Sequence, residues 1–208
     1  MEQTQYNHIY NIEADGLRRA IDMNGKWFLI DKEDKKVSKD YDDIYDLEKD
    51  GLRIARLNGK WFLIDKEDKK VSKEYDYIYD IETDGLRIAR LNEKYFLLDK
   101  QDNKVSKDYD YIYDIEKDGL RRARLNGKWI LINSKDEKVS KEYDHLYEIE
   151  TDGLRRARLN GNYFLLDKED NKVSKDYDNI YDITPEERRK AKPKGKLDIL
   201  KERFMGKL

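Results

Sequence analysis

The fold is decided by a stretch that reads Asp50-Gly51-Leu52-Arg53-Ile54-Ala55-Arg56-Leu57-Asn58-Gly59-Lys60-Trp61-Phe62-Leu63-Ile64-Asp65. Near-copies of this stretch begin at Asp15, Asp84, Asp118 and Asp152. Five copies of one unit predict a tandem repeat protein. Alignment on the motif Tyr-Asp-x-Ile-Tyr and its close variants gives repeats over 6–40, 41–74, 75–108, 109–142 and 143–176, and a partial sixth start that ends at 183.

Turn motifs divide each repeat into short strands. In the second repeat, Asp50-Gly51 and Asn58-Gly59 are flanked by apolar, β-branched and aromatic residues, the pattern of two-residue hairpin turns. A third, longer turn follows at 66–69, where Asp or Asn can adopt the left-handed conformation. The segments between the turns predict four strands, at about 44–48, 52–57, 60–65 and 70–72. None of them is long enough for a stable helix.

If both dipeptides are the central residues of type I′ turns, counting outward gives the strand register. The first turn then places Tyr45 opposite Arg56 and Glu48 opposite Arg53, and the second places Arg56 opposite Trp61. We therefore expect a column of Tyr45, Arg56 and Trp61 on one face and an ion pair between Glu48 and Arg53 on the other. Both faces carry large apolar side chains, so each sheet has to pack against neighbouring repeats.

The repeated pattern Gly-Leu-x-x-Ala-x-x-Asn-Gly-Lys-Trp-x-Leu-Ile-Asp-Lys, followed by Lys-Val-x-x-x-Tyr-Asp-x-Ile-Tyr-Asp, resembles the WG-containing repeats of bacteria. The resemblance covers residues 6–183. The Trp is Tyr95 and Tyr163 in two repeats, and the family's Gly after it is replaced by Phe28, Phe62, Phe96, Ile130 and Phe164. The resemblance implies a β-rich repeat array without established catalytic residues.

We expect an all-β fold, a solenoid-like tandem array of antiparallel four-stranded units with a short helical C-terminal cap. The alternative is a five-bladed β-propeller, in which the four strands of a repeat would form a blade. A repeat of 34 residues is short beside the roughly 40–45 of typical propeller repeats. The partial sixth repeat also favours an open end over a closed ring.

The composition changes at Thr184, where a basic tail begins. Thr184-Pro185-Glu186-Glu187 combines an N-cap residue, a first-turn proline and two acidic residues, which predicts a helix to near Lys192. Leu197, Leu200 and Phe204 predict a second, short amphipathic helix. We expect the tail to cap the last repeat by burying Leu200 and Phe204, or else to bind a partner.

Charge separates the array from this tail. The chain carries a net charge of −2, which divides into −7 over residues 1–183 and +5 over 184–208. An acidic array does not suit non-specific binding to nucleic acid duplexes. The sequence contains no cysteine, no run of 18 apolar residues and no signal-peptide pattern at its start, so we expect a cytoplasmic protein without a membrane partner.

Catalytic and metal-binding patterns are absent from the sequence. The two histidines, His8 and His145, share a repeat position that holds Asp43, Tyr77, Tyr111 and Asn179 in the other copies. A catalytic base needs one preorganised environment, so we predict that the protein is not an enzyme. The acidic third turn interleaves lysines and lacks the ligand spacing of a calcium loop, so we predict neither a metal nor another cofactor.

Arginine recurs at two fixed positions of the repeat, which are Arg18, Arg53, Arg87, Arg121 and Arg155, and Arg56, Arg90, Arg124 and Arg158. Such regularity favours structural ladders, paired with Glu and Asp on neighbouring strands, over phosphate binding. Two other positions vary while their surroundings stay the same: the one that contains the histidines, and one that holds Arg19, Ile54, Ile88, Arg122 and Arg156. If these positions lie on the surface, they set partner specificity. The candidate protein-binding residues are therefore Arg19, Tyr77, Tyr111, Arg122, His145, Arg156, Leu200 and Phe204.

The function predicted from the sequence is that of a non-enzymatic scaffold that binds another protein. One alternative is a small acidic inhibitor or decoy of a nucleic-acid-binding protein, with a phage or mobile-element, anti-defence origin. The other alternative is direct nucleic-acid binding through the basic tail.

Overall fold

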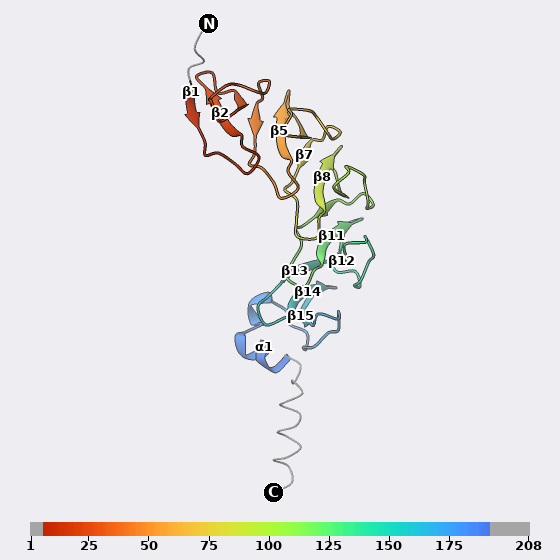
Figure 1. The fold of residues 1–208 in the computed structure, drawn as a ribbon. Coiled ribbons are helices and arrows are strands. Elements are labelled where there is room, and N and C mark those ends of the chain that lie inside the picture. The colour runs from red at the N-terminus through yellow and green to blue at the C-terminus, as the bar shows by residue number, and fades with distance from the viewer. Residues whose placement is uncertain (1–5, 192–208) are drawn as a thin grey trace. The chain divides into compact units, whose positions relative to one another are not determined.

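The computed structural model describes residues 6–191 (Figure 1). The chain divides into two compact units. The first runs to Asp114 and includes Ser134–Asp136, and the second comprises Ile115–Asn133 and the residues from Glu137 on.

The first unit contains three antiparallel sheets of three strands, each in chain order. They are built from β1 (Tyr6–Ile9), β2 (Arg18–Asp22) and β3 (Trp27–Ile30), from β4 (Asp43–Ile44), β5 (Arg53–Leu57) and β6 (Lys60–Ile64), and from β7 (Tyr77–Ile78), β8 (Arg87–Leu91) and β9 (Lys94–Leu98). The unit also contains β10 (Tyr111–Ile112). One repeat of the sequence thus supplies one small sheet.

The second unit repeats the pattern and then changes to helix. It contains the hairpin of β11 (Arg121–Leu125) and β12 (Lys128–Ile132) and the sheet of β13 (His145–Ile149), β14 (Arg155–Leu159) and β15 (Asn162–Leu166). A 3₁₀ turn, η1 (Ile180–Asp182), leads to the helix α1 (Pro185–Ala191). Thr184 caps α1 as predicted, because its hydroxyl accepts a 3.3 Å hydrogen bond from the Glu187 amide.

The register of the second hairpin confirms the prediction. Asn58 and Gly59 have φ values of 52° and 76°, as a type I′ turn requires. Arg56 lies opposite Trp61, and Ala55 lies opposite Phe62. The first repeat accommodates its extra residue in this turn, where a three-residue loop ends at Gly25 and the Asp22 amide donates to the Lys26 carbonyl.

The first hairpin differs from the prediction. Gly51 donates from its amide to the Glu48 carbonyl at 3.0 Å, and Glu48 donates to the Leu52 carbonyl at 2.9 Å. The loop therefore has three residues, a type I turn closed by Gly51 at a φ of 82°. Asp50 supports it, because its carboxylate accepts from the Leu52 amide at 3.2 Å.

The longer loop shifts the register of the first strand by one residue, and an irregularity between Tyr45 and Glu48 shifts it by one more, since the Glu48 amide donates to Leu52 whereas the Tyr45 amide donates to Ile54. Asp43, and not Tyr45, lies opposite Arg56, and Ile44 lies opposite Ala55. The shift by two residues keeps Tyr45 on the predicted face. The predicted pairing of Glu48 with Arg53 is wrong, since Arg53 finds its partners in the preceding repeat.

The predicted fourth strand is not a strand, so the expectation of four-stranded units is wrong. After the third turn the chain touches β6 only at single bridges, Ile64 with Lys70 and Trp61 with Tyr75. Between these bridges the Leu63 amide donates to the Ser72 hydroxyl at 2.7 Å. A side-chain oxygen thus takes the place of a backbone carbonyl and interrupts the ladder. Four other serines do the same, namely Ser38, Ser106, Ser140 and Ser174.

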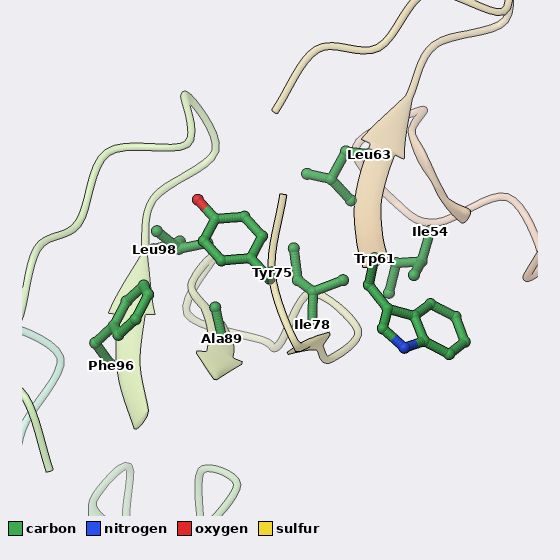
Figure 2. Close-up of a cluster of buried hydrophobic side chains, with 8 residues drawn as sticks. All are labelled: Ile54, Trp61, Leu63, Tyr75, Ile78, Ala89, Phe96 and Leu98. Carbon is green, nitrogen blue, oxygen red and sulfur yellow. The ribbon is translucent and has the colours of Figure 1, made fainter. Parts of the chain in front are cut away.

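The hydrophobic core of the first unit lies between successive sheets. Figure 2 shows Ile54, Trp61 and Leu63 of one sheet facing Ile78, Ala89, Phe96 and Leu98 of the next. Tyr75 fills the space between them. Because a fully buried large apolar side chain stabilises a fold by about 1.5–3 kcal/mol, each sheet depends on its neighbours, as the two apolar faces predict.

Candidate functional site

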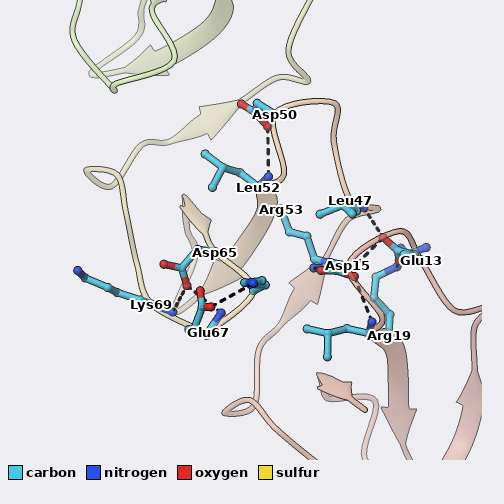
Figure 3. A network of polar contacts seen from close by, with 12 residues as sticks. Glu13, Asp15, Arg19, Leu47, Asp50, Leu52, Arg53, Asp65, Glu67 and Lys69 are labelled. Carbon is cyan, nitrogen blue, oxygen red and sulfur yellow. Dashed lines mark hydrogen bonds and ion pairs between the residues drawn. The ribbon is translucent and has the colours of Figure 1, made fainter. Parts of the chain in front are cut away.

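Within each unit, the buried arginine ladder joins successive repeats. The Arg53 side chain is 1% exposed and forms ion pairs with Glu13 and Asp15, the former at 3.2 Å (Figure 3). Arg87 pairs in the same way with Glu48 and Asp50. In the second unit, Arg155 lies 2.6 Å from Glu116 and 2.8 Å from Asp118.

The partners of this ladder are therefore a Glu-x-Asp turn of the preceding repeat, and not acids on a strand of the same sheet. Each turn uses both of its acids on one guanidinium, and the Glu also accepts from a backbone amide, as Glu48 does from Ile81 at 3.1 Å. A buried charge with this many partners is a structural element whose loss is strongly destabilising. It is not available to bind phosphate.

A second set of hydrogen bonds links neighbouring parts of the array, and here the donors come earlier in the chain than the accepting aspartate. Asp68, in the third turn, has a φ of 61°. Its carboxylate accepts from the Tyr41 hydroxyl at 2.5 Å and from the Lys39 amide at 2.9 Å. Lys39 belongs to the preceding repeat, and Tyr41 is bridged to Trp27 of the preceding sheet. The left-handed Asp was predicted from the sequence, whereas its role as a tie between repeats was not.

The first variable position is partly or fully buried. Arg19, Arg122 and Arg156 pair with the glutamate six residues before each of them, at 3.1, 2.5 and 2.8 Å. Where this position holds Ile54 or Ile88, the side chain is buried. Arg156 is the most exposed of the three arginines, with 32% of its side chain accessible. This position therefore alternates between a partly buried ion pair and a buried apolar contact.

The second variable position lies on a row of aromatic rings that pack against one another at tilted and edge-on angles. The Tyr77 ring is 5.2 Å from Trp61 and 4.7 Å from Tyr79. Tyr111 is likewise 4.8 Å from Tyr95 and 4.9 Å from Tyr113. We name this row of the first unit the aromatic ridge; it comprises Tyr45, Trp61, Tyr77, Tyr79, Tyr95, Tyr111 and Tyr113.

The second unit has an equivalent row, in which a histidine takes the variable position. His145 lies 6.0 Å from Trp129 and 4.4 Å from Tyr147. Burial, together with Arg122 and Arg158, lowers the pKa of His145 below its usual value of 6.5. The ring is therefore neutral at pH 7 and packs as an aromatic group.

The second arginine ladder covers these rings. Arg56 lies over Trp61 at 5.2 Å from the ring centre, Arg90 over Tyr95 at 5.7 Å, and Arg158 over Tyr163 at 5.4 Å. The predicted contact of Arg56 with Trp61 is confirmed. Such cation–π contacts contribute about 0.5–1 kcal/mol at exposed sites.

An acidic groove lies next to the ridge in the first unit. It has a volume of about 400 Å³, and its charged and aromatic lining consists of three acids, two basic residues and a tyrosine, namely Asp46, Glu48, Asp80, Arg19, Lys49 and Tyr45. Asp80 is exposed, and the Asp46 side chain is 78% accessible although it pairs with Arg19. A hydrogen bond to Tyr77 and burial raise the pKa of Tyr45 above its usual range. The groove thus presents exposed carboxylates beside neutral tyrosine hydroxyls.

Helix α1 covers the last repeat. Its Arg188 pairs with Asp152 at 2.6 Å and with Glu150 at 3.0 Å. Ile183, just before the helix, is buried against Leu154. The predicted capping residues Leu200 and Phe204 lie outside the described residues.

The acidic side chains do not form a metal site in the described part of the chain. Across residues 6–191, no three His, Cys, Asp or Glu side chains are grouped to hold a metal ion. Within the same range, no helix has the length and apolarity needed to cross a membrane.

The family comparison matches the repeats directly. A family model described as "WG containing repeat" matches residues 27–61, 61–95 and 96–129. Residues 27–129 are WG-containing repeats. The resemblance seen in the sequence is confirmed over this range. In these WG repeats the residue after Trp or Tyr points into the core: Phe28, Phe62 and Phe96 are at most 6% exposed. A large side chain thus fills the space between sheets where the family has Gly.

Solved structures give weaker similarities. The computationally designed Ika8 protein is 9% identical over 83% of this chain and 61% of its own, with a TM-score of 0.41. Kluyveromyces lactis Hsv2 is 7% identical over 80% and 63%, with a TM-score of 0.43. The WD40 β-propeller domain of Doa1 is 11% identical over 85% and 69%, with a TM-score of 0.37.

The chain thus spans less than two thirds of the first two of these proteins. Similarities at this level assign neither ring closure nor function. A search of the curated proteins finds no match.

Proposed function

We propose that this chain is a non-enzymatic repeat scaffold that binds another protein through the aromatic ridge and the acidic groove. The observation that carries the proposal is the juxtaposition of partly exposed, mutually packed Tyr rings with exposed carboxylates. Tyr, Trp and Arg are the residues most enriched at the energetic centres of protein interfaces. Their rings are already held in place by neighbouring repeats, so little conformational entropy is lost on binding.

Charge defines the chemistry of the proposed partner. Residues 1–183 carry a net charge of −7, and Asp46 and Asp80 project beside the ridge. A partner surface with lysine or arginine side chains complements this face, which speeds association and disfavours acidic partners. This chemistry also fits the narrower role of a decoy for a nucleic-acid-binding protein.

We also propose that the repeats form an open array whose last repeat is capped by a helix. Support comes from α1, which supplies to the fifth repeat the cation that a closed ring would take from the first. Arg188 of α1 already occupies both Glu150 and Asp152.

The test is affinity capture from nuclease-treated lysate, followed by titration of the purified partner against three proteins. Tyr113→Ala removes an exposed ring of the ridge, Asp80→Lys reverses a charge in the groove, and Glu67→Lys reverses an exposed charge in a third turn. We expect the first two variants to weaken binding at least about tenfold, or about 1.4 kcal/mol, and Glu67→Lys to bind like the wild type.

Two results would reject the proposal. One is a partner whose affinity is unchanged by both Tyr113→Ala and Asp80→Lys. The other is recovery of nucleic acid in place of protein from untreated lysate, with a steep loss of affinity as the salt concentration rises.

A further inference from the structure

We infer that the surface of the fifth repeat under α1 is a docking site for the first repeat of a second copy of this chain, and that α1 keeps it closed. This inference goes beyond the proposed function and does not depend on the aromatic ridge.

Helix α1 reproduces the arginine ladder of the repeats. In the second unit, Arg155 reaches back 37 residues to Asp118 and also binds Glu116. Arg188 reaches back 36 residues to Asp152, with Nε at 2.7 Å and Nη2 at 2.6 Å, and also binds Glu150. An arginine from a helix therefore takes the place that a strand arginine would take in a sixth repeat.

The tyrosine tie is reproduced as well. Tyr143 is bridged to Trp129 of β12, and its hydroxyl donates at 2.7 Å to Asp170, which follows β15 of the next sheet. Tyr177 is bridged in the same way to Tyr163 of β15, and its hydroxyl donates to Glu187 of α1 at 2.9 Å. Residues Glu187 and Arg188 thus supply, side by side, the two charged groups by which one repeat recognises another.

The first repeat carries the complementary half of this contact in an exposed form. The Arg18 side chain is 22% exposed, against 1–2% for Arg53, Arg87 and Arg155, and it turns to Asp34 of its own repeat. Ile12 is 57% exposed, whereas Ile149 at the equivalent position is 6% exposed.

The two ends of the molecule therefore match in chemistry. A second copy could place Arg18 on Glu150 and Asp152, and Ile12 on the apolar surface around Leu154, once α1 has moved away. Such a contact joins unlike surfaces and generates head-to-tail chains and not closed dimers. In the wild type, α1 outcompetes a second copy for the surface of the fifth repeat, because a group on the same chain has an effective concentration in the millimolar range.

The experiment uses the full-length protein and sedimentation velocity over a wide range of concentrations. We expect the wild type and Arg189→Ala, an exposed arginine of the same helix, to remain monomeric. Glu187→Ala/Arg188→Ala should self-associate at least about tenfold more tightly and form trimers and longer species as well as dimers. Arg188→Lys, which keeps the charge but loses the bidentate contact, should lie between them.

The decisive control adds Arg18→Ala to the double variant and should restore the monomer. The inference is overturned if the double variant stays monomeric at the highest concentration while its circular dichroism spectrum remains that of the wild type. It is also overturned if self-association persists in the triple variant, because the contact would then not involve the first repeat. If the double variant unfolds, the self-association of Arg188→Lys is measured in its place and judged by the same outcomes.

Discussion

Tyr75 donates a 2.7 Å hydrogen bond from its hydroxyl to the carboxylate of Asp102, and so joins the sheet that contains Trp61 to the next one. Asp102 has a φ of 63°, and its other oxygen accepts from the Lys73 amide at 2.8 Å. Burial and this hydrogen bond raise the pKa of Tyr75 above its usual range, so the hydroxyl stays protonated as a donor. One left-handed aspartate thus fixes two points of the chain that follows the preceding sheet.

Tyr75→Phe removes this bond without changing the ring. We expect a loss of about 1–3 kcal/mol in the free energy of unfolding, because the substitution leaves a carboxylate oxygen without its donor. Urea denaturation measures the change. Tyr181→Phe is the matched control, since Tyr181 is 86% exposed. Equal midpoints for the two variants would contradict the proposed tie.

Glu93→Gly should stabilise the protein. Glu93 has a φ of 63° in the turn where Gly59, Gly127 and Gly161 stand in other repeats. A non-glycine residue is strained there, so we expect a gain of about 1 kcal/mol in the free energy of unfolding. Thermal denaturation checks this. Glu67→Gly, at an exposed position without positive φ, should instead destabilise, and a loss of stability in both variants would refute the explanation.

Ile54→Arg should lower the pKa of Glu48. Burial raises the pKa of Glu48 to about 7, although Arg87 opposes this shift. In the first repeat the equivalent glutamate, Glu13, also binds Arg19. A second cation beside Glu48 favours its charged form. Carboxyl carbon NMR shifts during a pH titration measure the change, and an unchanged midpoint would show that the introduced guanidinium does not reach the glutamate.

The same group makes wild-type stability depend on pH. Because the pKa of Glu48 in the folded protein lies above its usual value of 4.5, the folded state holds an extra proton between these values. Its contribution to stability is therefore present below pH 4.5 and is lost as the pH rises towards 7. Denaturation at pH 5 and pH 7 should show a smaller loss in Ile54→Arg than in the wild type.

His145→Tyr should remove a pH-dependent loss of stability. The pKa of His145 is lowered in the folded protein, so the unfolded chain binds the proton more readily. This group therefore destabilises the protein as the pH falls below 6.5. We expect the melting temperature of the wild type to fall more than that of His145→Tyr between pH 7.5 and pH 5.5. Tyr77 and Tyr111 at equivalent positions show that tyrosine fits. If the melting temperatures of both proteins fall equally between pH 7.5 and pH 5.5, the pH dependence does not come from His145.

Local features of this fold could be read from the sequence. Asn58-Gly59 fixed a type I′ turn and, with it, the pairing of Arg56 with Trp61. Apolar residues on both strand faces required packing between repeats. These predictions succeeded because each depends on residues close together in the chain.

Contacts between repeats could not be derived in the same way. The three-residue loop at Asp50-Gly51 and a further irregularity in the strand before it moved the register by two, and Arg53 pairs with the preceding repeat. The signal was present, since a Glu-x-Asp-Gly turn precedes the ladder arginine in every copy. A single copy, however, does not show whether its Glu and Asp pair with its own arginine or with the arginine of the next repeat. For the same reason, the partly buried ion pair of Arg19 with Glu13 was not predicted.

The hydrogen bonds from tyrosine hydroxyls and lysine amides to the left-handed aspartates, which we call ties, allow the chain to change in length by whole repeats. Tyr–Asp ties span 27 residues in each case, and the equivalent backbone ties span 29. Both groups of each tie recur every 34 residues. Duplication or loss of one whole period therefore restores every tie at the junction without any compensating substitution. Unequal recombination between copies can lengthen or shorten such a protein by one repeat in a single step, and each product keeps all of these hydrogen bonds at the new junction.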